Sequence, residues 1–344
     1  MKFVLFCQNP YAFGILAPIK DVLIEREHLY IWFLTENIVG KLPFNNDPST
    51  NDIKKLKEYE ADAILCPGNE VPHYLRGLKV QIFHGLAGEK KGHFRIRHYF
   101  DLYLTQGPYF TSRFKELQKK YTDFDVIETG WSKLDTYGQN LRKYAGDKKA
   151  FLQKYQTNKL ILYAPTFSPS LTSAPYLAEE ITKLAENEHF LVVIKFHDLM
   201  AQEVIDIYKA LAAKRKNIII EKAPNILRLL LMADLMISDT SSVVYEFLLL
   251  NKPVITFRSN SENILWENSE AYSHLTEKVV KNLAEDPFRQ KREKIIENYH
   301  PYSDGKSSLR MVNAIEEYIK ENGVPEKRKL SFLRRLKINR MFGK

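Results

Sequence analysis

Short runs of apolar residues alternate with longer amphipathic runs along most of the chain. The apolar runs are rich in valine, isoleucine and aromatic residues and predict β-strands, whereas the amphipathic runs predict helices. Strands are expected at 2–7, 30–35, 61–66, 79–84, 101–107, 125–130, 159–167, 189–197, 217–222, 234–239 and 253–257. Helices are expected at 15–27, 109–121, near 133–144, and at 202–216 and 241–250. Strands that alternate with helices are typical of α/β folds with parallel sheets.

This alternation pauses in a polar stretch at 143–158 and then restarts. A chain of 344 residues is longer than one hydrophobic core usually serves. We therefore expect a GT-B-like α/β protein with two Rossmann-like domains that face a cleft. The expected domains are 1–147 and 148–322, followed by a basic amphipathic tail at 323–344. Ligands of such sheets bind beyond the carboxyl ends of the strands, so candidate residues are sought there.

The composition suits a protein with substantial cores, since 44% of the residues are hydrophobic and 12% are aromatic. Neither a membrane-spanning run nor a signal peptide is expected. The only cysteines, Cys7 and Cys66, lie in strand-like runs and are expected to be reduced core residues of a cytoplasmic protein.

The net charge of +9 is concentrated at one end of the chain. Residues 327–344 contain eight basic residues and no acidic ones, which leaves the rest of the chain close to neutral. A neutral body argues against nucleic acid as a partner. Leu333 and Leu336 are spaced for one helical face among these basic residues, which is typical of a helix on an anionic membrane surface. A solvated tail, an RNA-binding tail and a tail packed on the first domain are the alternatives.

The sequence "VQIFHG" puts His84 and Gly85 at the end of a predicted strand. Glycine allows a sharp turn and the close approach of a ligand. An imidazole there is able to take a proton from a hydroxyl group near neutral pH. The alternative is a structural histidine that caps the strand.

Two further strand ends carry polar side chains. Thr166 follows one strand in "YAPTFSPS", and Lys195 and His197 follow the next in "VVIKFHD", where strand alternation would put both on one face. A cation and an imidazole suit a phosphate ligand. Ordinary loops and solvated strand ends are the alternatives.

The segment "DLMISDTSSVVYEF" is the most informative. Asp239 ends a strand, and the hydroxyls of Thr240, Ser241 and Ser242 come where a helix begins, a position that favours anions. Glu246 follows one turn later. The alternative is ordinary helix capping. The segment at 300–310 leaves the same two possibilities open.

A loop after His84 is basic and contains aromatic residues. Its charged side chains include Lys90, Lys91, Arg95 and Arg97, which are candidates for an anionic acceptor. A solvated loop is the alternative. The chain has no dinucleotide fingerprint, P-loop or nucleophile elbow, and no D-x-D motif ends a strand, so no metal or cofactor is expected.

Together, "HG", "APTF", "K-x-H", "DTSS…E" and the late "DGK" resemble the CDP-glycerol glycerophosphotransferases, the teichoic-acid primases and polymerases. The resemblance covers roughly 80–310. It implies a GT-B fold, with an acceptor domain followed by a nucleotide-donor domain. It also implies transfer of glycerol phosphate from CDP-glycerol to an acceptor hydroxyl, with release of CMP. His84 would be the base, and His197, Thr240, Ser241 and Ser242 would engage the donor pyrophosphate.

The chain departs from the family pattern at several positions. Leu86 and Ala87 follow "HG" where members often have "TP", Asp198 replaces the proline after "K-x-H", and Ser168 stands where arginine often follows "APTF". The family's "G-x-P-R-N-D" is replaced by residues 130–135. These changes leave the transferred group and the acceptor open.

The expected partners are therefore a CDP-activated donor, an anionic or lipid-linked glycan acceptor and an anionic membrane. The expected location is the cytoplasm, peripheral on the inner face of the plasma membrane. A GT-B nucleotide-sugar transferase or epimerase is the first alternative. A non-catalytic membrane-surface protein is the second.

Overall fold

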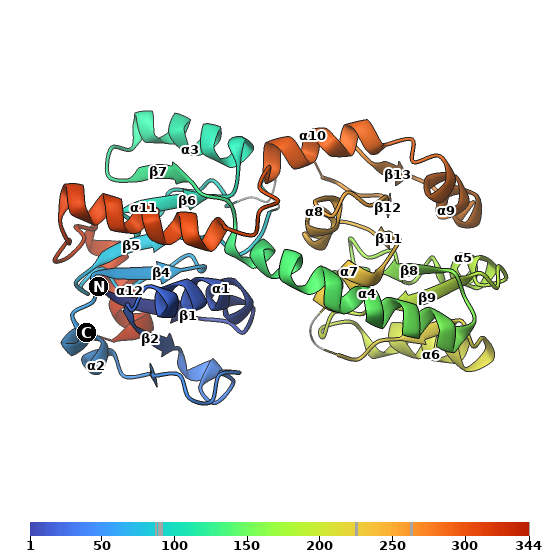
Figure 1. The fold of residues 1–344 in the computed structure, drawn as a ribbon, viewed down its shortest axis with the longest axis horizontal. Coiled ribbons are helices and arrows are strands. Elements are labelled where there is room, and N and C mark those ends of the chain that lie inside the picture. The colour runs from blue at the N-terminus through green and yellow to red at the C-terminus, as the bar shows by residue number, and fades with distance from the viewer. Residues whose placement is uncertain (87, 89–91, 224–225, 262–263, 344) are drawn as a thin grey trace. The chain divides into compact units, whose positions relative to one another are not determined.

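The structure is a computed structural model of the chain, and it describes all residues except 87, 89–91, 224–225, 262–263 and 344. It divides into two compact units. Unit 1 comprises Met1–Gly138 and Asn298–Lys344, and unit 2 comprises Gln139–Glu297. Each unit contains one parallel sheet with helices packed beside it (Figure 1). The predicted α/β class is therefore confirmed.

Unit 1 contains a seven-stranded sheet in the order β3-β2-β1-β4-β5-β6-β7. Its strands are β1 (Lys2–Cys7), β2 (Leu29–Leu34), β3 (Ser49–Thr50), β4 (Ala63–Cys66), β5 (Leu78–Gln81), β6 (Leu102–Thr105) and β7 (Asp125–Glu128). Its helices include α1 (Tyr11–Glu25), α2 (Ile53–Tyr59), α3 (Pro108–Lys120), the start of α4 (Asp135–Tyr155), α11 (Ser307–Asn322) and α12 (Phe332–Phe342). The central strands β4, β5 and β6 are buried throughout, as is typical of parallel strands covered on both faces, and the burial in β5 includes the polar side chains of Lys79 and Gln81.

Helix α11 belongs to unit 1 although the whole of unit 2 lies between it and the first segment of unit 1 in the sequence. The carboxylate of Asp135 accepts hydrogen bonds from the backbone N–H groups of Ser307, at 2.9 Å, and Ser308, at 2.6 Å. These are free donors at the start of α11, so Asp135 caps that helix. The segment at 300–310 therefore contains a capped helix start. Of the two possibilities, an anion site and ordinary helix capping, the structure shows capping.

The C-terminal tail is also part of unit 1. The side chain of Arg328 is almost buried, and it binds the carboxylates of Asp101 and, at 2.7 Å, Asp123. In helix α12, Ile338 is fully buried in the core of unit 1, and the ring of Phe342 lies 5.4 Å from that of Phe6. Figure 1 shows α11 and α12, in red, beside the blue strands of this sheet. Of the alternatives for the tail, packing on the first domain is the one observed.

Unit 2 contains a six-stranded parallel sheet in the order β10-β9-β8-β11-β12-β13. Its strands are β8 (Lys159–Tyr163), β9 (Phe190–Ile194), β10 (Ile218–Ile220), β11 (Leu235–Ser238), β12 (Val254–Phe257) and β13 (Glu267–Ser269). Its helices are most of α4, α5 (Ala178–Leu184), α6 (Gln202–Lys214), α7 (Leu227–Met232), α8 (Val243–Leu248), α9 (Leu275–Ala284) and most of α10 (Arg289–Tyr299). The strand order reverses between β8 and β11, the point where such sheets bind ligands.

The units differ from the domain limits expected from the sequence. The polar stretch at 143–158 is mostly the second half of α4, a helix that continues to Tyr155 before β8 begins. Residues 298–322, which were expected in the second domain, pack in unit 1. Among the described helices, none has the length and apolar character needed to cross a bilayer.

Candidate active site

His84 lies just beyond β5, at the carboxyl edge of the unit 1 sheet. Its Nδ1 atom is 2.9 Å from the carbonyl oxygen of Pro67. A carbonyl oxygen only accepts hydrogen bonds, so Nδ1 carries the hydrogen and the neutral ring keeps a lone pair at Nε2. The side chain is exposed, and its ring lies 5.2 Å from that of Tyr11. An accessible, proton-accepting nitrogen is therefore present at this edge.

The residue before His84 has an unusual backbone. Phe83 has a φ of 59°, in the left-handed region that a bulky side chain seldom adopts and that costs on the order of 1–3 kcal/mol. Two contacts hold it there. Its ring stacks on His93 at 5.2 Å, and its carbonyl accepts a hydrogen bond from the indole of Trp131 at 3.4 Å. This turn directs His84 out of the sheet.

A residue that the sequence analysis missed supports the same loop. The buried side chain of Gln106, just after β6, donates a hydrogen bond to the carbonyl of Gly85 at 3.1 Å. The available signal was a polar residue at the end of the neighbouring strand. Gly85 itself has open space around it, because an added Cβ atom would meet nothing within 4 Å. Its predicted contact with the donor remains a prediction.

The basic loop after His84 is only partly described, because Lys90 and Lys91 lie outside the described residues. Arg95 is exposed, whereas Arg97 donates hydrogen bonds to the carbonyls of Gly92, at 3.1 Å, and Arg95, at 3.2 Å. Arg97 therefore stabilises the conformation of the loop and also adds a positive charge to it. His93 is packed among aromatic rings, and this burial lowers its pKa to about 3, so it is neutral.

In unit 2, the candidate residues follow three adjacent strands. Thr166 follows β8, Lys195 and His197 follow β9, and the segment 239–242 follows β11. Two contacts join these loops. The N–H of Thr166 donates to Asp239 at 2.8 Å, and the ring of Phe167 lies 4.4 Å from that of His197. The sheet thus gathers the predicted residues at its switch point.

His197 has the opposite hydrogen-bonding arrangement to His84. Its Nδ1 accepts a hydrogen bond from the backbone N–H of Leu199 at 3.1 Å. The hydrogen of the neutral ring must therefore be on Nε2, which becomes a donor. The side chain is exposed. One exposed imidazole offers a proton acceptor and the other offers a hydrogen-bond donor.

The end of β9 differs from the sequence prediction. The strand ends at Ile194, so the alternation that would put Lys195 and His197 on one face does not continue to His197. Lys195 is also less accessible than expected. Lys195 is 9% exposed and its ammonium donates to the carbonyl of Phe196 at 3.0 Å.

Asp239 is fully buried and accepts hydrogen bonds from Thr166 and from both the N–H and hydroxyl of Ser173. Burial raises the pKa of this carboxyl to about 6. Its hydrogen bonds fix the loop that carries Thr166, so the structure makes Asp239 a positioning residue and not the ligand contact expected from sequence.

The hydroxyl-rich segment after Asp239 has its own pattern of contacts. The hydroxyl of Thr240 accepts a hydrogen bond from the N–H of Asn260 at 3.2 Å. Ser242 precedes α8 without a side-chain capping bond, and within the described residues neither it nor Ser241 has a side-chain hydrogen bond. The capping alternative therefore does not account for these two serines. Glu246 is almost buried within the short helix α8.

The family model for CDP-glycerol:poly(glycerophosphate) glycerophosphotransferases matches residues 84–317. The chain therefore belongs to this family, which confirms the resemblance seen in its motifs. It is 29% identical over 213 residues to the teichoic acid glycerol-phosphate primase of Bacillus subtilis, covering 57% of this chain and 52% of that one. It is 26% identical over 227 residues to the teichoic acid ribitol-phosphate polymerase TarL of Staphylococcus aureus, covering 60% and 39%. The chain matches about half or less of the length of these relatives.

Solved structures share the fold. The wall teichoic acid polymerase TagF superposes with a TM-score of 0.67 at 18% identity, over 93% of this chain and 89% of that one. A putative UDP-N-acetylglucosamine 2-epimerase from Listeria monocytogenes gives 0.68 at 14% identity, over 96% and 99%. At these identities the likeness shows the GT-B-like fold alone, which both a polymerase and an epimerase use.

Proposed function

We propose that the chain transfers glycerol phosphate, or a related polyol phosphate, from a CDP-linked donor to a hydroxyl group of a cell-surface glycan or lipid-linked acceptor, releasing CMP. Family membership supports the class of reaction. A structure of the related TagF polymerase was obtained after a soak with CDPG, which supports a CDP-linked donor.

The observation that carries the mechanism is the hydrogen bond from His84 Nδ1 to the carbonyl of Pro67. It leaves Nε2 free to accept the proton of the acceptor hydroxyl. As that proton leaves, the acceptor oxygen attacks the β-phosphorus of the donor. The bond from the β-phosphorus to the bridging oxygen breaks, and its electron pair departs with CMP.

The candidate donor-binding residues of unit 2 would stabilise the negative charge that develops on the departing phosphate. His197 offers an Nε2–H donor there, and Ser241 and Ser242 offer hydroxyls without partners in the described chain. Donors fixed before the reaction stabilise developing charge without further rearrangement. Thr166, Lys195, Thr240 and Glu246 stay candidates for donor contact, and Arg95 and Arg97 for an anionic acceptor.

The proposal also puts the protein on the inner face of the plasma membrane through α12. Because Ile338 fixes one face of this helix in unit 1, its other face is held outward. Leu333 is 77% exposed and Leu336 is 50% exposed there, and helical spacing puts the exposed Arg340 on the same face. A fixed apolar and basic face suits an anionic membrane surface.

Substrate specificity tests the function directly. We expect labelled CDP-glycerol to release CMP only when a glycerol-phosphate or glycan acceptor is present, and UDP- and CMP-sugars to be inert. Turnover of UDP-sugars without turnover of CDP-glycerol would identify a sugar transferase or epimerase. The absence of both turnover and nucleotide binding would favour a non-catalytic protein.

Donor affinity tests the unit 2 site. We expect His197→Ala to weaken CDP-glycerol binding about tenfold or more, because it removes a hydrogen bond to a charged group. Ser241→Ala should weaken it less. Isothermal titration calorimetry measures both. His189→Ala is the matched control, since His189 precedes β9 at the opposite edge of the sheet. Equal affinity in His197→Ala and His189→Ala would exclude a donor contact by His197.

A further inference from the structure

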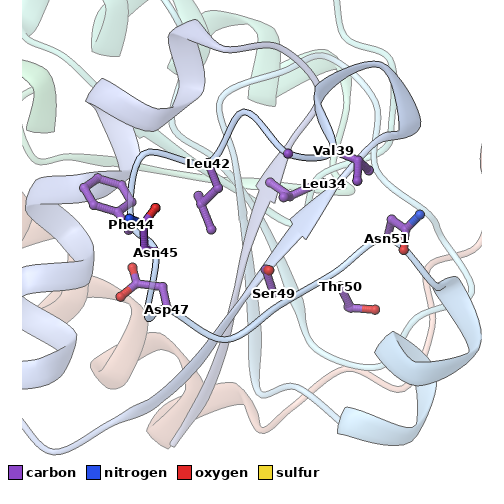
Figure 2. Close-up of a pocket in the computed structure, with 10 residues that line it drawn as sticks. Leu34, Val39, Leu42, Phe44, Asn45, Asp47, Ser49, Thr50 and Asn51 are labelled. Carbon is purple, nitrogen blue, oxygen red and sulfur yellow. The ribbon is translucent and has the colours of Figure 1, made fainter.

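Unit 1 contains a pocket of about 330 Å³ at the carboxyl end of β2. The end of that strand, the short β3 and the loop between them form its walls. In the view of Figure 2, the apolar side chains of Leu34 and Leu42 lie between the amides of Asn45 and Asn51. The proposed reaction steps use none of these residues.

Asp47 is the only charged side chain among the described lining residues, and its carboxylate is already satisfied. One oxygen accepts a hydrogen bond from Tyr30 and the other accepts one from the indole of Trp32, both at 3.0 Å. The ammonium of Lys20 lies 3.2 Å from the second oxygen. An anionic ligand would be repelled by this carboxylate. A cationic ligand would find both carboxylate oxygens already bound to Tyr30, Trp32 and Lys20. The pocket therefore favours a neutral ligand.

The same contacts hold the pocket in shape. The ammonium of Lys20 also lies 4.1 Å from the centre of the Phe44 ring, which stacks on Trp32 at 5.5 Å. Phe44 and Asp47 are thus both anchored to β2 and α1. A loop fixed in this way loses little conformational freedom when a ligand binds.

The available polar groups are uncharged. Asn45, Ser49 and Asn51 are exposed and make no side-chain hydrogen bond within the described residues. The amide and hydroxyl groups are able to hydrogen-bond to the hydroxyls of a ligand, while Leu34 and Leu42 are able to contact the apolar face of its ring. We propose that this pocket binds a neutral sugar ring.

The position of the pocket connects it to the proposed reaction. Strands β2, β1, β4 and β5 are neighbours in that order, and all are parallel. The pocket and His84 therefore share one edge of the sheet, about 14 Å apart at the usual strand spacing. One or two further sugar units would span that distance. Resting on the proposed function, the inference is that a neutral sugar of the acceptor occupies the pocket while its reactive hydroxyl lies at His84.

Methyl NMR of the full chain tests the binding without any turnover. With leucine methyl groups labelled, glucose and N-acetylglucosamine at millimolar concentration should shift the resonances of Leu34 and Leu42. Glycerol 3-phosphate should leave these two unchanged. We expect Asn45→Ala to weaken sugar binding about five- to tenfold, the effect of one lost hydrogen bond. Asn46→Ala, which changes the next residue outside the pocket, should match the wild type.

Three results would overturn the inference. They are unchanged Leu34 and Leu42 resonances with both sugars, equal shifts with glycerol 3-phosphate, and equal affinity in Asn45→Ala and Asn46→Ala. Leu42→Trp, which fills the pocket, adds a kinetic test: KM for a glycan acceptor should rise at least tenfold while CDP-glycerol affinity stays unchanged. If the chain fails to use CDP-glycerol at all, the proposed function fails, whereas the sugar-induced shifts still decide whether the pocket binds sugar.

Discussion

Replacing His84 with alanine is expected to lower kcat at least a hundredfold, with little effect on CDP-glycerol affinity. General-base catalysis contributes roughly 10²- to 10⁴-fold, and the proton-accepting Nε2 of His84 would be lost. The exposed imidazole contributes little to the core, so the variant should fold normally. Acceptor-dependent CMP release gives kcat, and circular dichroism checks the fold.

Two comparisons make this result specific. His28→Ala is a matched control, because His28 lies in the same unit just before β2, at the opposite edge of the sheet, where it pairs with Glu316 at 2.6 Å. Its loss should leave kcat unchanged. Gln106→Leu should lower kcat more mildly, since it removes the hydrogen bond to Gly85 but keeps the base. Wild-type kcat in folded His84→Ala would return this histidine to a structural role.

Ending the chain after Pro325 is expected to destabilise unit 1 by about 3 kcal/mol or more. Removing a buried isoleucine such as Ile338 costs about 2–5 kcal/mol, and leaving the carboxylate of Asp101 without Arg328 adds to that. A domain of this size should then melt at least about 5 °C lower. Differential scanning calorimetry measures the change. An unchanged transition would mean that the contacts of the tail contribute nothing.

Truncation alone does not test membrane binding, because it also removes structural contacts. The double variant Leu333→Glu, Leu336→Glu changes only the outward face of α12. It should melt like the wild type yet lose co-sedimentation with phosphatidylglycerol vesicles at low salt, where basic residues bind anionic surfaces best. Equal sedimentation of the double variant and the wild type would rule out this face as the membrane contact.

The sequence pattern predicts most of the strands and the positions of both histidines, for a physical reason, but it misses the short edge strands β3 and β13. Parallel strands deliver whatever follows them to one edge of a sheet, so His84 and His197 could be found from apolar runs alone. The pattern says less about side-chain direction. Asp239 carries suitable chemistry, but its burial and its hydrogen bonds to the loop decide that it faces the protein interior, and Lys195 is less accessible than its place after a strand suggests.

The sequence pattern does not predict which distant segments of the chain pack together. An amphipathic helix such as α11 has the same periodicity whichever sheet it covers, so its place in unit 1 could not be deduced. The contact that settles it joins Asp135 to Ser307. Likewise, Arg328 looked like one of many tail charges, and only its pairing with Asp101 and Asp123 distinguishes it.

The division of unit 1 into two chain segments affects how the protein is made. On a ribosome, residues 1–138 emerge first, but Ile338 of the same core follows 200 residues later. At about 5–20 residues per second, this delay is roughly 10–40 s. Unit 2, which is continuous, is able to complete its core in that interval. The nascent first segment meanwhile exposes apolar surface, so binding by a chaperone during synthesis should matter more for unit 1 than for unit 2.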